Sequence, residues 1–183
     1  MLLRHAKSDW PDVPDEKRPL AKRGRHDAPA VGRWLRDHGY LPDVVVCSVA
    51  RRTRQTWELM APELGGSPSV IFEPRAYDAS ALTLLYLAQE LPAPCQAALL
   101  IGHNPAISQL ATALVATELA EPPAEDGAPA EDGAPAEDGA PAEAAAGLRF
   151  PTAAVAVFEF AGDWPGLAAG KARLIDFTAP ADL

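Results

Sequence analysis

The sequence predicts an α/β fold, a three-layer α/β/α sandwich around a mostly parallel sheet. Two short apolar runs, 43–47 and 97–102, suit strands that are buried on both faces. Stretches with apolar residues at helical spacing lie between and after these runs, so strands and helices alternate along the chain. Such alternation is typical of a sheet with helices packed on both of its faces.

The individual elements are predicted from their apolar periodicity. Strands are expected at 1–3, 43–47, 70–72, 97–102, 154–160 and 172–177, and helices at 28–38, 52–64, 82–91 and 106–118. In the first helix Val31, Trp34 and Leu35 share one face. The first strand has only three residues before Arg4, whereas a central strand usually has about five or six. Either the true start lies upstream or this strand is unusually short.

The 183 residues are enough for one core and too few for two ordinary domains, so a single domain over 1–183 is expected. Residues 124–141 repeat the unit Ala-Glu-Asp-Gly-Ala-Pro three times. The repeat has one sign of charge, recurrent Pro and Gly, and no large apolar side chain to bury. We therefore expect a disordered acidic insertion at about 120–147 within the domain.

The charge is distributed unevenly around this insertion. The chain has a net charge of −9, of which eight negative charges lie between Glu121 and Glu143, so the remainder carries −1. From Met1 to Thr56 there are twelve Lys or Arg and seven Asp or Glu, a net charge of +5. A basic N-terminal part favours an anionic ligand, although scattered surface cations alone explain the excess equally well.

Composition also restricts the compartment and the partners. Only Cys47 and Cys95 are present, which gives no disulfide framework, and no signal peptide or membrane-length apolar segment is recognisable. We expect a soluble, cytoplasmic protein with neither nucleic acid nor membrane among its partners.

Polar residues follow three of the predicted strands at the point where each strand ends. Arg4 and His5 follow the first, Ser48 and the cluster 51–56 follow the second, and His103 follows the strand at 97–102. Ligands of open α/β sheets bind beyond the carboxyl ends of the strands. Guanidinium groups match phosphoryl oxygens, and an imidazole can donate a proton or attack phosphorus. The sequence therefore predicts a phosphate site at this edge.

Four motifs resemble those of the histidine phosphatase superfamily, which has the phosphoglycerate mutase-like fold. They occur in family order: Arg4-His5-Ala6, Asp15-x-x-Arg18-Pro19-Leu20-x-x-x-Gly24, Ser48-x-x-x-Arg52-Thr53-x-Gln55-Thr56 and Gly102-His103-Asn104-Pro105. The second is similar to a segment of the SixA-type phosphohistidine phosphatases, as is Ala6 in place of glycine. The resemblance implies a phosphatase that acts through a covalent phosphohistidine.

This resemblance also implies the role of each site residue. His5 is the nucleophile, with its second nitrogen protonated and held by a backbone carbonyl. Arg4, Arg52 and His103 bind the phosphoryl oxygens and stabilise the transition state. The family spacing selects Arg52 over Arg51 and Arg54, which are expected at the surface. His26 and His38 lie outside the motifs and are expected to be exposed.

The general acid is assigned from its position alone. The family places an acidic residue after the strand at 70–72, which makes Asp78 the candidate and Glu73 the reserve. Capping of the helix at 82–91 explains Asp78 equally well. A phosphorylated imidazole that is protonated on its second nitrogen leaves without an acid, so phosphohistidine substrates need this group less than esters do.

Other phosphatase chemistries fit the sequence poorly. Four residues separate Cys47 from Arg52, where a cysteine-dependent phosphatase needs five, and none of them is glycine, so Cys47 is interpreted as a buried strand residue. Neither His-x-His nor His-x-x-Glu occurs, so we expect no metal and no cofactor.

The substrate is the least constrained part of the interpretation. Phosphohistidine in a phosphorylated protein is favoured, with Lys7, Trp10, Lys17 and Arg18 as candidate contacts around the pocket rim. One alternative is a small-molecule phosphomonoesterase or mutase, although so compact a chain has little room for a lid. Another is a non-catalytic phosphate-binding protein, which the intact set of motif residues argues against.

Overall fold

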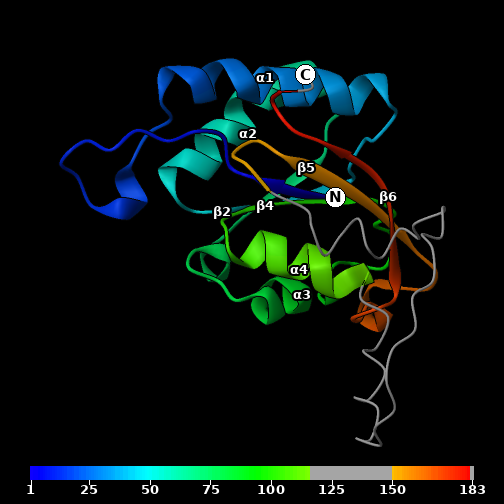
Figure 1. The fold of residues 1–183 in the computed structure, drawn as a ribbon. Helices are drawn as coiled ribbons and strands as arrows, with labels where there is room; N and C mark the ends of the chain where they lie inside the picture. The colour runs from blue at the N-terminus through cyan, green and yellow to red at the C-terminus, as the bar shows by residue number, and fades with distance from the viewer. Residues whose placement is uncertain (116–149, 182–183) are drawn as a thin grey trace, which may run out of the picture.

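Residues 1–115 and 150–181 are described by a computed structural model, and they form one six-stranded sheet with helices on both faces (Figure 1). The strand order is β3-β2-β4-β1-β5-β6. The strands are β1 (Leu2–Arg4), β2 (Val44–Ser48), β3 (Ser69–Glu73), β4 (Ala98–Gly102), β5 (Val155–Phe160) and β6 (Ala172–Thr178). Strands β3, β2, β4 and β1 pair in parallel, and β5 is antiparallel to both of its neighbours. The predicted mostly parallel α/β sandwich is confirmed.

Two helices cover each face of the sheet. Figure 1 shows α1 and α2 on one side and α3 and α4 on the other. They are α1 (Lys22–Asp37), α2 (Arg51–Leu64), α3 (Ala81–Gln89) and α4 (Ala106–Val115), and short 3-10 turns are η1 (Asp15–Lys17), η2 (Pro74–Ala76) and η3 (Trp164–Gly166). No helix among the described residues is long and apolar enough to cross a membrane.

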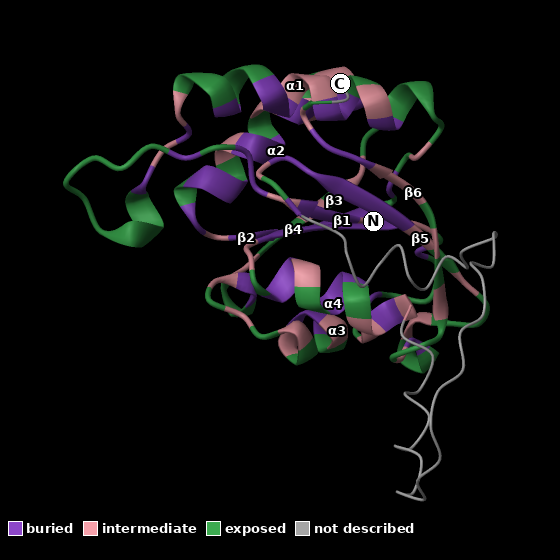
Figure 2. Ribbon diagram, in the orientation of Figure 1, coloured by how far each residue is buried: buried purple, intermediate pink, exposed green. Residues whose placement is uncertain are grey.

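Side-chain alternation along the central strands divides the core into two clusters. Leu3, Val45 and Leu99 point to the cluster beneath α1 and α2, whereas Leu2 and Leu100 point to the cluster against α3 and α4. Strands β2 and β4 are buried along their whole length, which explains their unbroken apolar sequences (Figure 2). The sheet is therefore packed on both faces beneath the loops at its carboxyl edge.

Helix α1 begins six residues before the predicted start at Ala28. The prediction was wrong because Gly24 and Pro29 are poor helix formers and the first turns are densely charged. Close packing explains why a glycine stands here: a Cβ at Gly24 would lie 2.2 Å from the Lys7 carbonyl oxygen. Gly32 allows the same close approach to α2, with a Cβ position 2.4 Å from the Met60 carbonyl oxygen.

The predicted acidic insertion at about 120–147 lies outside the described residues, as does the end of the predicted helix at 106–118. The segments on its two sides belong to the same sheet, because β4 precedes it and β5 and β6 follow it. The first strand has three residues, Leu2–Arg4, as its sequence indicates.

Candidate active site

The three strand ends singled out in the sequence meet at the carboxyl edge of the sheet. His5 follows β1, Arg52 lies in the first turn of α2 after β2, and His103 follows β4. The ring centroids of His5 and His103 are 5.1 Å apart, and the Arg52 Nε donates to His103 Nδ1 at 3.2 Å. The fold thus brings together groups that are about fifty to a hundred positions apart in the sequence.

His5 is buried and has a defined tautomer. Its Nδ1 lies 2.7 Å from the Ala6 carbonyl oxygen, and because a carbonyl only accepts, Nδ1 carries the proton. The backbone carbonyl expected to orient the ring is therefore present. Burial lowers the pKa of His5 to about 4, and the charges of Arg52 and Arg4 act in the same direction. The imidazole is neutral at pH 7, with the lone pair on Nε2.

His103 has the opposite tautomer because Arg52 donates to its Nδ1. The proton is then on Nε2, which donates to the Ser48 Oγ at 2.8 Å. Burial, followed by the neighbouring His5 and Arg52, lowers the pKa of His103 to about 3. Ser48, named in the sequence only as part of a motif, is thus the residue that orients His103.

Arg52 is the buried member of the arginine cluster, and Arg51 and Arg54 are exposed, as predicted from the family spacing. Besides His103, its guanidinium donates to the Asp15 carbonyl oxygen at 2.8 Å and to Asp15 Oδ2 at 3.0 Å. Further donor hydrogens remain for a ligand, since a guanidinium carries five.

Arg4 is partly buried beside these groups. Its Nη1 donates to the Phe150 carbonyl oxygen at 2.7 Å, and the Asn104 side chain donates to the same oxygen at 3.0 Å. Burial lowers the pKa of Arg4. Its Nε has no hydrogen-bond partner among the described residues, an unfavourable state for a buried donor unless a ligand supplies an acceptor.

Asp15 and Tyr77 are functional-site residues to which the sequence analysis assigned no role. Asp15 Oδ1 accepts from Arg18 at 2.8 Å, and its Oδ2 accepts from the Tyr77 hydroxyl at 2.9 Å as well as from Arg52. These bonds, that to Arg18 most of all, lower the pKa of Asp15 to about 2. The Tyr77 ring meets His103 edge-on, with centroids 5.8 Å apart. The position of Asp15 within a motif is a sequence signal that could have identified it as a site residue. For Tyr77 the sequence offers no such signal beyond its position next to Asp78.

The expectation that Arg18 contacts a substrate at the pocket rim was wrong. Arg18 is buried, and its guanidinium donates to the Asp9 carbonyl oxygen, to Asp15 and to Ser8 Oγ. Its guanidinium also lies 3.3 Å from the centroid of the exposed Trp10 ring. Because every nitrogen of the fork has a protein acceptor, Arg18 holds the loop over 9–15 in place and is not a free contact for a partner.

The two acid candidates differ in their surroundings. Asp78 is exposed, has a positive φ of 52° and lines the cavity at the site, whereas the α3 N-cap is Ser80, which accepts from the Thr83 amide at 3.1 Å. The capping explanation for Asp78 is therefore wrong. Glu73 forms an ion pair with Arg75, and hydrogen bonds from Arg75 lower the pKa of Glu73. Of the two candidates, Asp78 is therefore the one with access to the cavity.

Motif residues around the site hold the backbone in place. Thr56 Oγ1 accepts from the Ala6 amide at 3.0 Å, and Gln55 accepts from the Leu20 amide at 2.8 Å. The Thr53 hydroxyl donates to the carbonyl oxygens of Ser48 and Ala50, between β2 and α2. Cys47 is buried, and burial raises the pKa of its thiol to about 12, so it is no nucleophile. His26 and His38 are exposed, as expected.

A small cavity lies at the site, beside Arg52 and His103. It has a volume of about 130 Å³ and is lined by residues that include Asp15, Arg52, Tyr77, Asp78 and His103. The charges of Arg4, Arg18 and Arg52 act on His5, and Asp15 pairs with two of these three guanidinium groups, so the surroundings of His5 carry an excess of positive charge that favours a phosphoryl dianion. No group of three or more His, Cys, Asp or Glu in residues 1–115 and 150–181 is placed to hold a metal ion.

The two neutral histidines make stability depend on pH. Both have a folded-state pKa far below the ordinary value of 6.5, so the unfolded chain binds more protons between about pH 6.5 and 4. The free energy of unfolding is therefore expected to fall as the pH drops through this window, by on the order of 1 kcal/mol per pH unit for each histidine.

Urea unfolding at several pH values tests this expectation. A variant with both His5→Asn and His103→Asn removes the titrating groups and should show a flatter dependence on pH in the same window. Equal slopes for the two proteins would contradict the assignment of neutral, buried rings.

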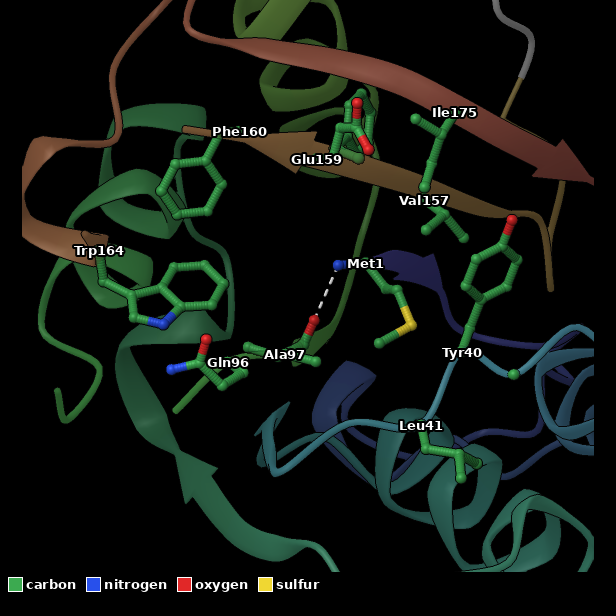
Figure 3. A pocket seen from close by; sticks show the side chains of 13 residues that line it. Met1, Tyr40, Leu41, Gln96, Ala97, Val157, Glu159, Phe160, Trp164 and Ile175 are labelled. Atoms are coloured by element: carbon green, nitrogen blue, oxygen red, sulfur yellow. Dashed lines mark hydrogen bonds between the residues drawn. The ribbon is translucent and has the colours of Figure 1, made fainter. Parts of the chain in front are cut away.

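A second cavity, of about 280 Å³, lies at the opposite end of the sheet (Figure 3). Met1, Tyr40 and Trp164 are among its lining residues. None of the predicted catalytic side chains is among the described residues around it, so it is separate from the phosphate site.

Comparisons with known proteins point to one family and one fold. A model of the histidine phosphatase superfamily (branch 1) matches residues 1–80. An uncharacterised protein of Mycobacterium tuberculosis, Rv1276c, is 32% identical over 179 residues, which are 97% of this chain and 99% of the relative. The structure of a proposed phosphohistidine phosphatase SixA from Nakamurella multipartitia has a TM-score of 0.78 and 30% identity, covering 98% of this chain and 95% of that one. The histidine phosphatase SixA in complex with tungstate shares the fold, with a TM-score of 0.68 and 19% identity over 98% of this chain and 96% of that one.

Proposed function

The chain belongs to the histidine phosphatase superfamily as a SixA-type member, and within this family of phosphatases we propose that it hydrolyses phosphohistidine in proteins through a covalent intermediate on His5. One observation carries the proposal. His5 is a neutral imidazole whose Nδ1 proton is held by the Ala6 carbonyl, and no described residue hydrogen-bonds its Nε2. A lone pair on a fixed ring, among guanidinium groups, is what attack on phosphorus requires.

In the first step the Nε2 lone pair of His5 attacks phosphorus. A bond forms between Nε2 and phosphorus, the bond from phosphorus to the leaving group breaks, and its electron pair goes to the leaving atom. Arg4 and Arg52 bind the phosphoryl oxygens and stabilise the charge spread over them. His103 lies beside them, and its Nε2–H, which donates to Ser48 in the structure, is the hydrogen that it could donate to a phosphoryl oxygen. The Ala6 carbonyl stabilises the positive ring that forms, because it accepts from Nδ1 throughout.

In the second step water attacks phosphorus from the side that the leaving group has vacated. The bond to Nε2 breaks, its electron pair returns to the ring, and the proton lost by water passes to phosphate or solvent. His5 is then neutral again with its proton on Nδ1. No metal or cofactor takes part in the proposed cycle.

The leaving group favours phosphohistidine over an ester. An alkoxide needs a proton donor, whereas an imidazole protonated on its second nitrogen leaves as a neutral molecule. Asp15 is ionised near neutral pH, since its pKa is about 2, and Glu73 is held by Arg75. Asp78 is proposed to supply any proton that an ester requires.

The test is phosphate release without added metal from a phosphohistidine peptide and from a panel of phosphomonoesters. The expected result is a kcat/KM for the phosphohistidine peptide that exceeds those for the esters. A clear preference for one small ester would replace this proposal with that of a small-molecule phosphomonoesterase.

A further inference from the structure

Asp15 is the anionic side chain that contacts the buried guanidinium groups of the phosphate site. It bridges Arg18 and Arg52 and accepts from Tyr77, yet its side chain remains 50% exposed and lines the cavity. A carboxylate in a cavity for a phosphoryl dianion opposes binding of that dianion by like-charge repulsion. A carboxylate that only held two arginines in place could be fully buried. Because half of the Asp15 side chain is exposed in the cavity, it can also contact the substrate.

The hydrogen-bond inventory of Asp15 leaves room for a ligand. A carboxylate offers about four acceptor positions. Three are taken: Oδ1 accepts from Arg18, and Oδ2 accepts from Arg52 and Tyr77. The remaining acceptor position is on Oδ1 and needs a hydrogen-bond donor. Unprotonated phosphoryl oxygens and ester oxygens carry no hydrogen and therefore cannot fill it.

We infer that Asp15 is a specificity-determining residue that accepts a hydrogen bond from the free N–H of the substrate's phosphorylated imidazole. The inference rests on the proposed function and names the group that would distinguish phosphohistidine from phosphate esters. The Arg52 guanidinium contacts His103 with one nitrogen and Asp15 with another, so Asp15 is next to the phosphoryl-binding groups. Asp15 also lines the cavity that the leaving group would occupy.

The chemistry of the P–N bond explains why such an acceptor helps. When the ring nitrogen remote from phosphorus is protonated, cleavage of the P–N bond returns the electron pair to the other nitrogen and releases a neutral imidazole. A carboxylate beside that N–H favours the protonated ring, because an opposite charge stabilises the cation. An ester has no proton at this place, and an ionised carboxylate cannot give it one.

The test compares Asp15→Asn with the wild type on a phosphohistidine peptide and on p-nitrophenyl phosphate. Asparagine keeps an oxygen acceptor but loses the charge that stabilises the protonated ring, so kcat/KM should fall at least about tenfold more for the peptide than for the ester. Asp12→Asn, an exposed carboxylate in the same loop, is the matched control and should leave both values unchanged. Thermal unfolding of each variant verifies the fold.

The outcomes separate the inference from the proposed function. A parallel loss on both substrates would show that Asp15 only positions Arg52 and Arg18, and an unchanged value for the peptide would show that it does not contact the leaving group; either result overturns the inference alone. A wild-type protein without activity on the phosphohistidine peptide would overturn the proposed function and the inference together.

Discussion

Substitution of His5 by alanine is expected to lower kcat for every substrate by about a thousandfold or more. The change removes the proposed nucleophile, so neither binding of the phosphoryl group nor the arginines around it can compensate. Phosphate release under saturating substrate measures the effect.

His26→Ala is a matched control, because His26 is an exposed histidine on α1 outside the site. It should retain wild-type activity. Turnover by His5→Ala at a rate within tenfold of the wild type would exclude His5 as the nucleophile.

Substitution of Arg52 by alanine is expected to reduce kcat/KM by about a hundred- to a thousandfold. The loss has two causes: the phosphoryl oxygens lose a charged donor, and His103 Nδ1 loses the donor that fixes its tautomer. Arg52→Lys should recover only part of the activity, because an ammonium group keeps the charge but not the planar fork. Steady-state kinetics on the preferred substrate measure both variants.

Arg51→Ala and Arg54→Ala provide the controls, since both side chains are exposed on the same turn of α2. Each should stay within about twofold of the wild type. If either exposed arginine proved as important as Arg52, the assignment of the cluster would be wrong.

Much of the fold was predictable because the apolar sequence pattern identifies the central strands. Strands β2 and β4 are buried on both faces, and this burial is visible in their sequences as unbroken apolar runs. The start of α1 was not predictable from periodicity, because Gly24 and Pro29 lower the helix propensity of its first turns. The helix is stabilised there by close packing against Lys7 and α2, which only the fold reveals.

The meeting of the candidate site residues at one edge of the sheet was predictable because these residues follow strand ends. Arg4, His5, Arg52 and His103 were identified in this way together with their motifs. The contacts of Arg18 were not, since a charged residue in a polar loop is usually exposed and its burial depends on acceptors supplied by Ser8, Asp9 and Asp15.

The role of Tyr77 was hidden for a related reason. It is contributed by the loop after β3, and its partner Asp15 is 62 positions away in the sequence. Hydrogen bonds between distant loops follow no local pattern, so motif spacing gives the residues of the site but not the network that joins them.

The central claim is that phosphoryl transfer passes through His5, and trapping the intermediate tests it most directly. Wild-type protein mixed rapidly with substrate, quenched in base and digested should yield one phosphorylated peptide, with the group on His5 and lost on acid treatment. A phosphoryl group on any other side chain, or steady turnover with no phosphorylated peptide at any time after mixing, would contradict the account.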